Sequence, residues 1–158
     1  IGSNPGGSIN LAFIGSQTAS IAGQLSLLSN SSNNNTYTAT NSTTTVTGTI
    51  NSIGVITSTT SNLLITTGTY RHLFTTTNGT IPTATWSSTS TCSIQGYTTN
   101  TTIPSGTAQT FGNFTWNTPN QNTGSINLVN NIVAITGNFT VIATGTTAAR
   151  ELRMGGTG

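Results

Sequence analysis

The chain has 158 residues and a formal net charge of +2, and only 3% of its residues are charged. Threonine is the commonest residue, and the charged side chains are Arg71, Arg150, Glu151 and Arg153. A nucleic-acid-binding protein needs a basic stripe that contacts phosphates, and three arginines do not form one. No apolar run approaches the ~20 residues with which a helix crosses a bilayer.

Disorder is an alternative for so polar a chain, but disordered segments are usually rich in charge and poor in β-branched and aromatic residues. The apolar residues here are mostly Ile, Leu, Val, Phe and Trp in short alternating runs, which favours a folded protein.

One cysteine allows no internal disulfide. A lysine-free, nearly uncharged surface leads us to expect an extracellular location. The start at Ile1 and the Gly-Gly-Thr-Gly end lead us to expect a mature product or a segment of a longer chain.

Apolar and polar residues alternate with a period of two along much of the chain, as in half-buried strands. The clearest runs are residues 8–11, 25–27, 114–116, 139–141 and 152–154. Turn residues separate such runs at 30–35, 78–79, 104–106, 117–124 and 155–158. No segment shows a helical period, so we predict an all-β fold.

A repeat of the form glycine, polar, apolar, polar, apolar begins at Gly23, Gly112 and Gly137, with weaker copies at Gly48 and Gly68. These glycines lie 20 to 25 residues apart, except for one gap of 44 residues. The gap predicts a further copy at 91–94 that lacks its glycine. The sequence Gly-Ser-Ile-Asn-Leu also occurs twice, at 7–11 and at 124–128.

Repeats of this length, each with two or three short strands, are typical of one coil of a parallel β-solenoid. We therefore predict that residues 1–158 form a single β-solenoid segment with coils of about 20–25 residues. Each glycine is expected at a corner, where a side chain would collide or φ must be positive. Thr and Asn are expected to form hydrogen-bonded ladders between coils. The alternative is an antiparallel β-sandwich, for which only Asn78-Gly79 has the hairpin signal.

The alternation also predicts which side chains face the core. These are Ile9, Leu11, Leu25, Leu27, Ile94, Phe114, Trp116, Ile126, Leu128, Phe139, Val141, Leu152 and Met154.

The motifs GTYRH, IPTATW, TCSIQG, PSG, QTFGNFTWN and GNFTV follow one another between residues 68 and 141. In this order they resemble a repeat block of large secreted surface proteins of Bacteroidota. The resemblance implies an extracellular, β-helical adhesin or stalk, exported by the type IX secretion system and in some relatives linked to gliding motility. Relatives often carry cysteine where this chain has Thr118, so a bridge from Cys92 to that position cannot form here. These residues include no C-terminal sorting domain, so we expect the export signal to lie beyond Gly158.

Parallel β-helices include polysaccharide-cleaving enzymes, which need paired carboxylates or a carboxylate-bound calcium. Glu151 is the only carboxylate side chain, and we interpret it as a surface partner of a neighbouring arginine. His72 lacks further ligands at metal spacing, and Cys92 is interpreted as a small buried hydrophobe. We therefore expect a non-enzymatic segment without metal or cofactor; an enzyme whose catalytic residues lie elsewhere is the alternative.

Two further hypotheses concern binding. Trp86 and Trp116 are the candidates for stacking on sugars, although the alternation places Trp116 in the core. Thr-x-Thr pairs at 45–47, 57–59, 67–69 and 83–85 suggest a β-helical ice-binding face, but their spacing is too uneven for a flat lattice.

Both end coils lack a cap, so we expect further coils of the same chain or export machinery to cover them. An uncharged surface suits polysaccharide or a solid surface as partner.

Overall fold

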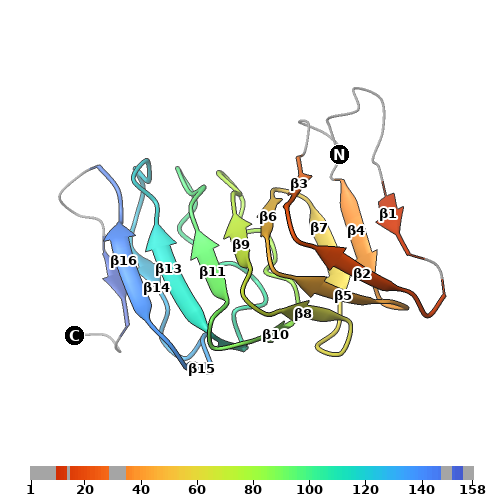
Figure 1. Cartoon of the computed structure of the whole chain (residues 1–158). Helices are drawn as coiled ribbons and strands as arrows, with labels where there is room; N and C mark the ends of the chain where they lie inside the picture. Colours follow the sequence, from red (N-terminus) through yellow and green to blue (C-terminus); the bar gives the residue numbers. More distant parts are fainter. Residues whose placement is uncertain (1–9, 14, 29–34, 147–150, 155–158) are drawn as a thin grey trace.

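The structure is a computed structural model that describes residues 10–13, 15–28, 35–146 and 151–154 (Figure 1). The described residues form 17 short β-strands and no helix. Neighbouring strands pair in parallel, and the chain forms a β-solenoid of about six turns. The predicted solenoid is therefore confirmed, and the antiparallel sandwich is excluded because its strands would pair in the opposite sense. No helix in the described part is long and apolar enough to span a membrane.

Three sheets form the sides of the first coils, and we name them sheets A, B and C. Sheet A contains β1 (Asn10–Ala12), β4 (Thr36–Ala39) and β7 (Val55–Ser58). Sheet B contains β2 (Thr18–Ile21), β5 (Thr43–Val46), β8 (Leu63–Ile65) and β10 (Thr85–Trp86).

Sheet C is the longest and crosses the front of the molecule in Figure 1. It contains β3 (Gln24–Leu27), β6 (Thr49–Ser52), β9 (Thr69–His72), β11 (Thr91–Ile94), β13 (Asn113–Asn117) and β16 (Phe139–Ala143). Two more pairs join β12 (Thr110–Phe111) to β15 (Ala134–Ile135) and β14 (Ile126–Asn127) to β17 (Leu152–Arg153).

The glycine repeat maps onto sheet C strand by strand. The residue after Gly48 pairs with the residues after Gly23 and Gly68, so the copies stack in register. The copy predicted at 91–94 is β11, which pairs with β9 on one side and with β13 on the other. The sequence repeat is therefore the structural repeat, including the copy without a glycine.

At every repeat glycine except Gly23, the preceding coil leaves no room for a side chain. A Cβ at Gly48 would lie 1.9 Å from the carbonyl oxygen of Gly23, and one at Gly112 would lie 2.0 Å from that of Ser87. None of the repeat glycines has a positive φ, so of the two expected reasons only collision applies. Positive φ occurs instead at turn glycines such as Gly79 and Gly106.

Ser90 occupies the glycine position in the coil of β11. The corner before β11 comprises residues 87–90, whereas residues 47–48 suffice before β6. Ser90 is buried, its backbone N–H donates to the carbonyl of Ser87, and its hydroxyl donates to the same carbonyl at 2.7 Å. The longer corner therefore accommodates a Cβ that the tight corners exclude.

The core consists of the inward-facing residues of successive coils, as the alternation predicts. Six of the predicted core residues are buried: Leu27, Ile94, Phe114, Trp116, Ile126 and Leu128. Four more are partly buried and pack against that core: Leu11, Leu25, Phe139 and Leu152. Aromatic rings also contact one another between neighbouring coils, for example Trp86 with Phe111, whose ring centroids are 5.1 Å apart, and Phe114 with Phe139, at 6.0 Å.

Two predicted core residues are exposed. Val141 pairs with Trp116 and points to the same side of sheet C, yet 47% of its surface is accessible because β16 is the last strand and no described coil covers it. Met154 directly follows β17, which is another outermost strand, and is 54% accessible. Placing both in the core was wrong. The predicted inward position of Ile9 lies outside the described residues.

Hydroxyl groups join the coils in a different way from the predicted side-chain ladders. Thr38 donates to the side chain of Asn10, as a ladder would require. More often the hydroxyl donates to a backbone carbonyl of the preceding coil, as Thr85 does to Thr60 and Thr136 to Phe111. These hydroxyl groups thus find hydrogen-bond partners without charge, mainly on the backbone.

Replacing Trp116 with alanine is expected to lower the free energy of unfolding by roughly 3–5 kcal/mol, because a large buried aromatic leaves a cavity. The matched control is Val141→Ala, which is on the same side of the sheet but exposed, and should cost less than about 1 kcal/mol. Urea denaturation of both variants measures the difference. Equal losses would show that Trp116 does not belong to the core.

The corner glycines offer a second matched pair. Gly48→Ala places a methyl group against the backbone of the preceding coil and should cost at least about 2 kcal/mol. Gly23 occupies the same repeat position, but a Cβ added there would meet nothing within 4 Å. Gly23→Ala should therefore leave stability unchanged or raise it by up to about 1 kcal/mol. Similar melting temperatures for the two variants would contradict the collision explanation.

Candidate functional site

The outer side of sheet C presents two rows of uncharged polar side chains interrupted by one cation. The first row contains Gln24, Thr49, Thr69, Thr91 and Asn113. The second row contains Ser26, Asn51, Arg71, Ser93, Thr115 and Thr140, of which Ser93 is buried. Arg71 is exposed and is the only charged residue in either row.

Three threonines at the centre of this surface have free hydroxyl groups. Thr49, Thr69 and Thr91 are in register on β6, β9 and β11, and none of their hydroxyls is hydrogen-bonded to another described residue. Parallel strands set the repeat between coils at ~4.8 Å. Strand pairing on both sides holds β9 in place. The result is a rigid row of groups that can both donate and accept hydrogen bonds.

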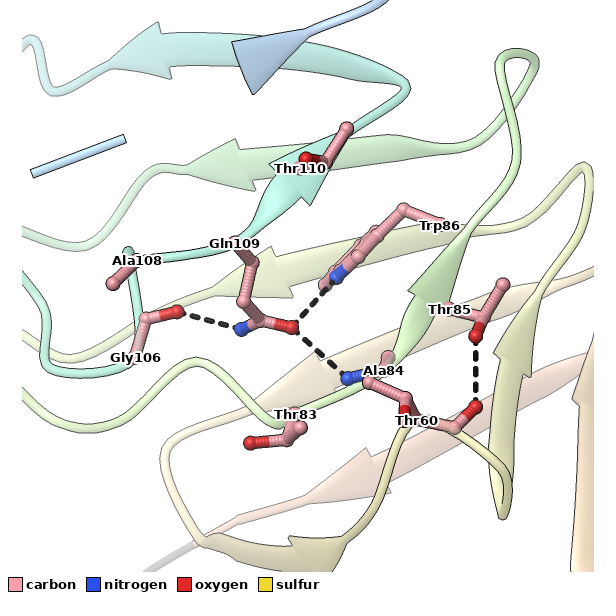
Figure 2. A pocket seen from close by; sticks show the side chains of 9 residues that line it. All are labelled: Thr60, Thr83, Ala84, Thr85, Trp86, Gly106, Ala108, Gln109 and Thr110. Atoms are coloured by element: carbon pink, nitrogen blue, oxygen red, sulfur yellow. Dashed lines mark hydrogen bonds between the residues drawn. The ribbon is translucent and has the colours of Figure 1, made fainter. Parts of the chain in front are cut away.

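A recess opens in the side of the solenoid where sheet B is interrupted. β10 pairs with β8, and β12 pairs with β15, but β10 and β12 do not pair with each other. The recess has a volume of about 510 Å³. Figure 2 shows the nine residues that line it, which come from three successive coils and are all uncharged.

The side chain of Gln109 joins the two coils at this interruption (Figure 2). Its Oε1 accepts hydrogen bonds from the backbone N–H of Ala84 at 3.0 Å and from the indole N–H of Trp86 at 3.2 Å. Its Nε2 donates to the carbonyls of Pro82 at 3.0 Å and Gly106 at 2.6 Å. The side-chain amide of Gln109 thus connects the two coils where β10 and β12 form no backbone hydrogen bonds with each other. It also fixes the two sides of the recess relative to each other.

A polar cluster in the core contains His72, the only histidine. The ring is fully buried, and its Nε2 lies 2.6 Å from the carbonyl oxygen of Asn78. Because a carbonyl only accepts, Nε2 carries the hydrogen and Nδ1 is free to accept from the Tyr70 hydroxyl, 3.2 Å away. The Tyr97 hydroxyl lies 3.2 Å from the Asn78 carbonyl oxygen and 2.9 Å from that of Thr102, and its single hydrogen is shared between these two acceptors.

Burial governs the ionisation of this cluster. Desolvation lowers the pKa of His72 to about 4, opposed by the hydrogen bond to Asn78, so the ring is neutral at pH 7. Burial also raises the pKa of the Cys92 thiol, which is fully enclosed between Tyr70 and Phe114 of the adjacent strands. A nucleophilic cysteine needs a thiolate and access, and Cys92 has neither. The predicted burial of Cys92 is confirmed.

The acidic residue also has the position expected for it. Glu151 accepts from the Nε of Arg153 at 2.7 Å, and both side chains are 58% accessible, so this is an exposed surface pair. Within the described ranges, no three residues of the types His, Cys, Asp and Glu lie close enough to hold a metal ion.

Neither tryptophan offers an exposed ring for stacking on a sugar. Trp116 is fully buried and donates its indole N–H to the Thr118 hydroxyl at 2.9 Å. Thr118 is itself buried and also bonds to Gln121. Trp86 is 7% accessible and presents only a small part of its surface to the recess.

The Thr-x-Thr pairs do not form one ladder. Residue 45 lies in sheet B, residue 57 in sheet A, residue 69 in sheet C, and residues 83–85 lead into β10 of sheet B. The row of Thr49, Thr69 and Thr91 was not predicted. The residue two positions after each threonine differs from coil to coil, so the three threonines do not share a Thr-x-Thr motif. The row follows from the glycine repeat, since each of its first two members comes directly after a repeat glycine. The role of Gln109 has no comparable signal in the sequence.

Comparison of the chain with protein-family models, with curated proteins and with solved structures finds no match.

The stability of the protein should depend on pH through His72. Its pKa is about 4 when folded and 6.5 when unfolded, so the unfolded chain binds more protons between these values. Stability is fully present above pH 6.5 and should fall by about 3 kcal/mol as the pH drops to 4, then level off. His72→Gln should abolish this dependence, since the chain has no other histidine. A flat wild-type profile in denaturant titrations would contradict the assignment.

Proposed function

We propose that the chain is a non-enzymatic segment of a larger extracellular surface protein, an adhesin or stalk. The resemblance to repeat blocks of type IX-secreted surface proteins supports export by that system and a part in attachment or gliding movement. The solenoid architecture agrees with such a role, because stacked coils give an extended surface whose neighbouring repeats present the same kind of groups.

The observation that carries the proposal is the outer face of sheet C. Its two rows contain hydroxyl and amide groups and a single charge, and the hydroxyls of Thr49, Thr69 and Thr91 are free. An uncharged surface does not steer charged ligands from a distance. It does offer many weak hydrogen bonds to a polysaccharide or to a hydrated solid surface, and such contacts add up when many coils engage at once.

The edges of sheet C support a place within a longer repeat array. β3 and β16 are its outermost strands, and apolar side chains are exposed near each: Leu28 at 41% and Ile142 at 63%. Unpaired strands with exposed apolar side chains tend to pair with further strands. We propose further coils of the same protein as the partner of both edges.

A flow assay tests the adhesive face. Beads coated with the protein should be retained on polysaccharide-coated glass, and T49V/T69V/T91V should reduce retention by roughly tenfold or more, since each lost hydrogen bond is worth about 1 kcal/mol. Valine keeps the β-branched shape and therefore the fold.

The matched control is T36V/T38V/T57V, which removes three hydroxyls from the outer face of sheet A. If both triple variants reduce retention equally, or if neither does, the face of sheet C is not the adhesive surface. In the parent cell, deletion of the whole protein should impair attachment or surface movement without removing a glycan-cleaving activity.

A further inference from the structure

The geometry points to the recess between β10 and β12 as a binding site for a neutral carbohydrate. This inference rests on the proposed function in that it names a class of ligand for an adhesive surface protein. It concerns a different part of the molecule from the face of sheet C, so the two can be tested separately.

The shape and lining of the recess suit a sugar ring. Ligand sites are typically hollows of about 300–1,000 Å³ with mostly apolar walls and a few directed polar groups, and this recess measures about 510 Å³. Ala84, Ala108 and part of Trp86 provide apolar surface. A sugar ring has apolar C–H faces and a polar rim of hydroxyls, which matches this division.

Three threonine hydroxyls around the recess are available to a ligand. Those of Thr60, Thr83 and Thr110 make no hydrogen bond within the described part of the chain, and all three residues are exposed. The Thr85 hydroxyl, by contrast, is already bonded to the Thr60 carbonyl at 2.8 Å. Each free hydroxyl can donate one hydrogen bond and accept others, as recognition of sugar hydroxyls requires.

The walls are already held in place before a ligand arrives. Gln109 uses both of its amide atoms in four hydrogen bonds that connect Pro82, Ala84 and Trp86 on one side with Gly106 on the other. A preformed site loses little conformational entropy on binding. Because no charged side chain lines the recess, nothing in it favours an acidic sugar over a neutral one.

The test is a two-dimensional NMR titration of the folded protein with maltohexaose and cellohexaose, and separately with hexagalacturonate. The chain has two tryptophans, hence two indole N–H resonances, and Trp86→Phe assigns them. At least one neutral glucan should shift the Trp86 indole resonance and the amides of residues 83–86 and 106–110. The Trp116 indole N–H, bonded to Thr118 in the core, should not move. The acidic oligomer should bind no better than the neutral ones.

Variants separate this site from the adhesive face. A108W fills the recess from an exposed position and should abolish the shifts, while T83V/T110V should weaken binding by roughly three- to tenfold through two lost hydrogen bonds. T36V/T57V is the control and should bind normally. T49V/T69V/T91V should also bind the soluble glucan normally even where bead retention is reduced.

Three results would overturn the inference. One is the absence of shifts with both neutral glucans up to their solubility limits. Another is that shifts appear only on sheet C, or persist unchanged in A108W. The third is tighter binding of hexagalacturonate than of either neutral glucan. The adhesive role proposed for sheet C would stand or fall on the flow assay in each case.

Discussion

The structure depends on parallel, in-register stacking of one coil on the next. Each strand of sheet C directs its peptide N–H and C=O groups along the stacking axis, and β9 is bonded on both sides. Such stacking demands that two backbones approach closely at every tight corner. The glycine before β6 meets that demand, since any side chain there would overlap the carbonyl of Gly23. Register, core and outer surface all follow from this contact, because it fixes which residues of successive coils coincide.

The same stacking explains how the protein dispenses with charge. At several places a carbonyl group of one coil lies next to a hydroxyl of the following one, so threonines such as Thr85 and Thr136 find acceptors without ionised partners. The core follows the same rule: His72 is neutral and bonded to the Asn78 carbonyl, and Trp116 donates to a threonine hydroxyl. A buried neutral group with a hydrogen-bond partner avoids most of the cost of burying an ion.

The period of the sequence predicts the solenoid, the register of sheet C and part of the core, because alternation and repeat length are local properties. Buried residues such as Ile50, Tyr70 and Phe111 were not on the predicted list. The glycine-free copy at β11 could be placed by spacing alone. The exposure of Val141 could not, since alternation determines the side of a sheet to which a residue points but not whether another coil covers it. The interruption between β10 and β12 was also unpredictable: it depends on the side-chain conformation of Gln109 and on three neighbouring turns. The recess, and with it the proposed sugar site, therefore became visible only in three dimensions.

The direction of the strand-to-strand hydrogen bonds has a mechanical consequence. The N- and C-terminal ends of the described chain lie at opposite ends of the stack (Figure 1), so a pulling force between them acts along the stacking axis. The hydrogen bonds between neighbouring strands are parallel to that force, so the bonds between one pair of coils can break before those of the next pair. Hydrogen bonds perpendicular to the force would instead all bear it together. A coil of ~22 residues releases roughly 75 Å of extended chain when it opens. A tether built of such coils would yield in steps and dissipate work, while the coils that remain closed keep their surfaces intact.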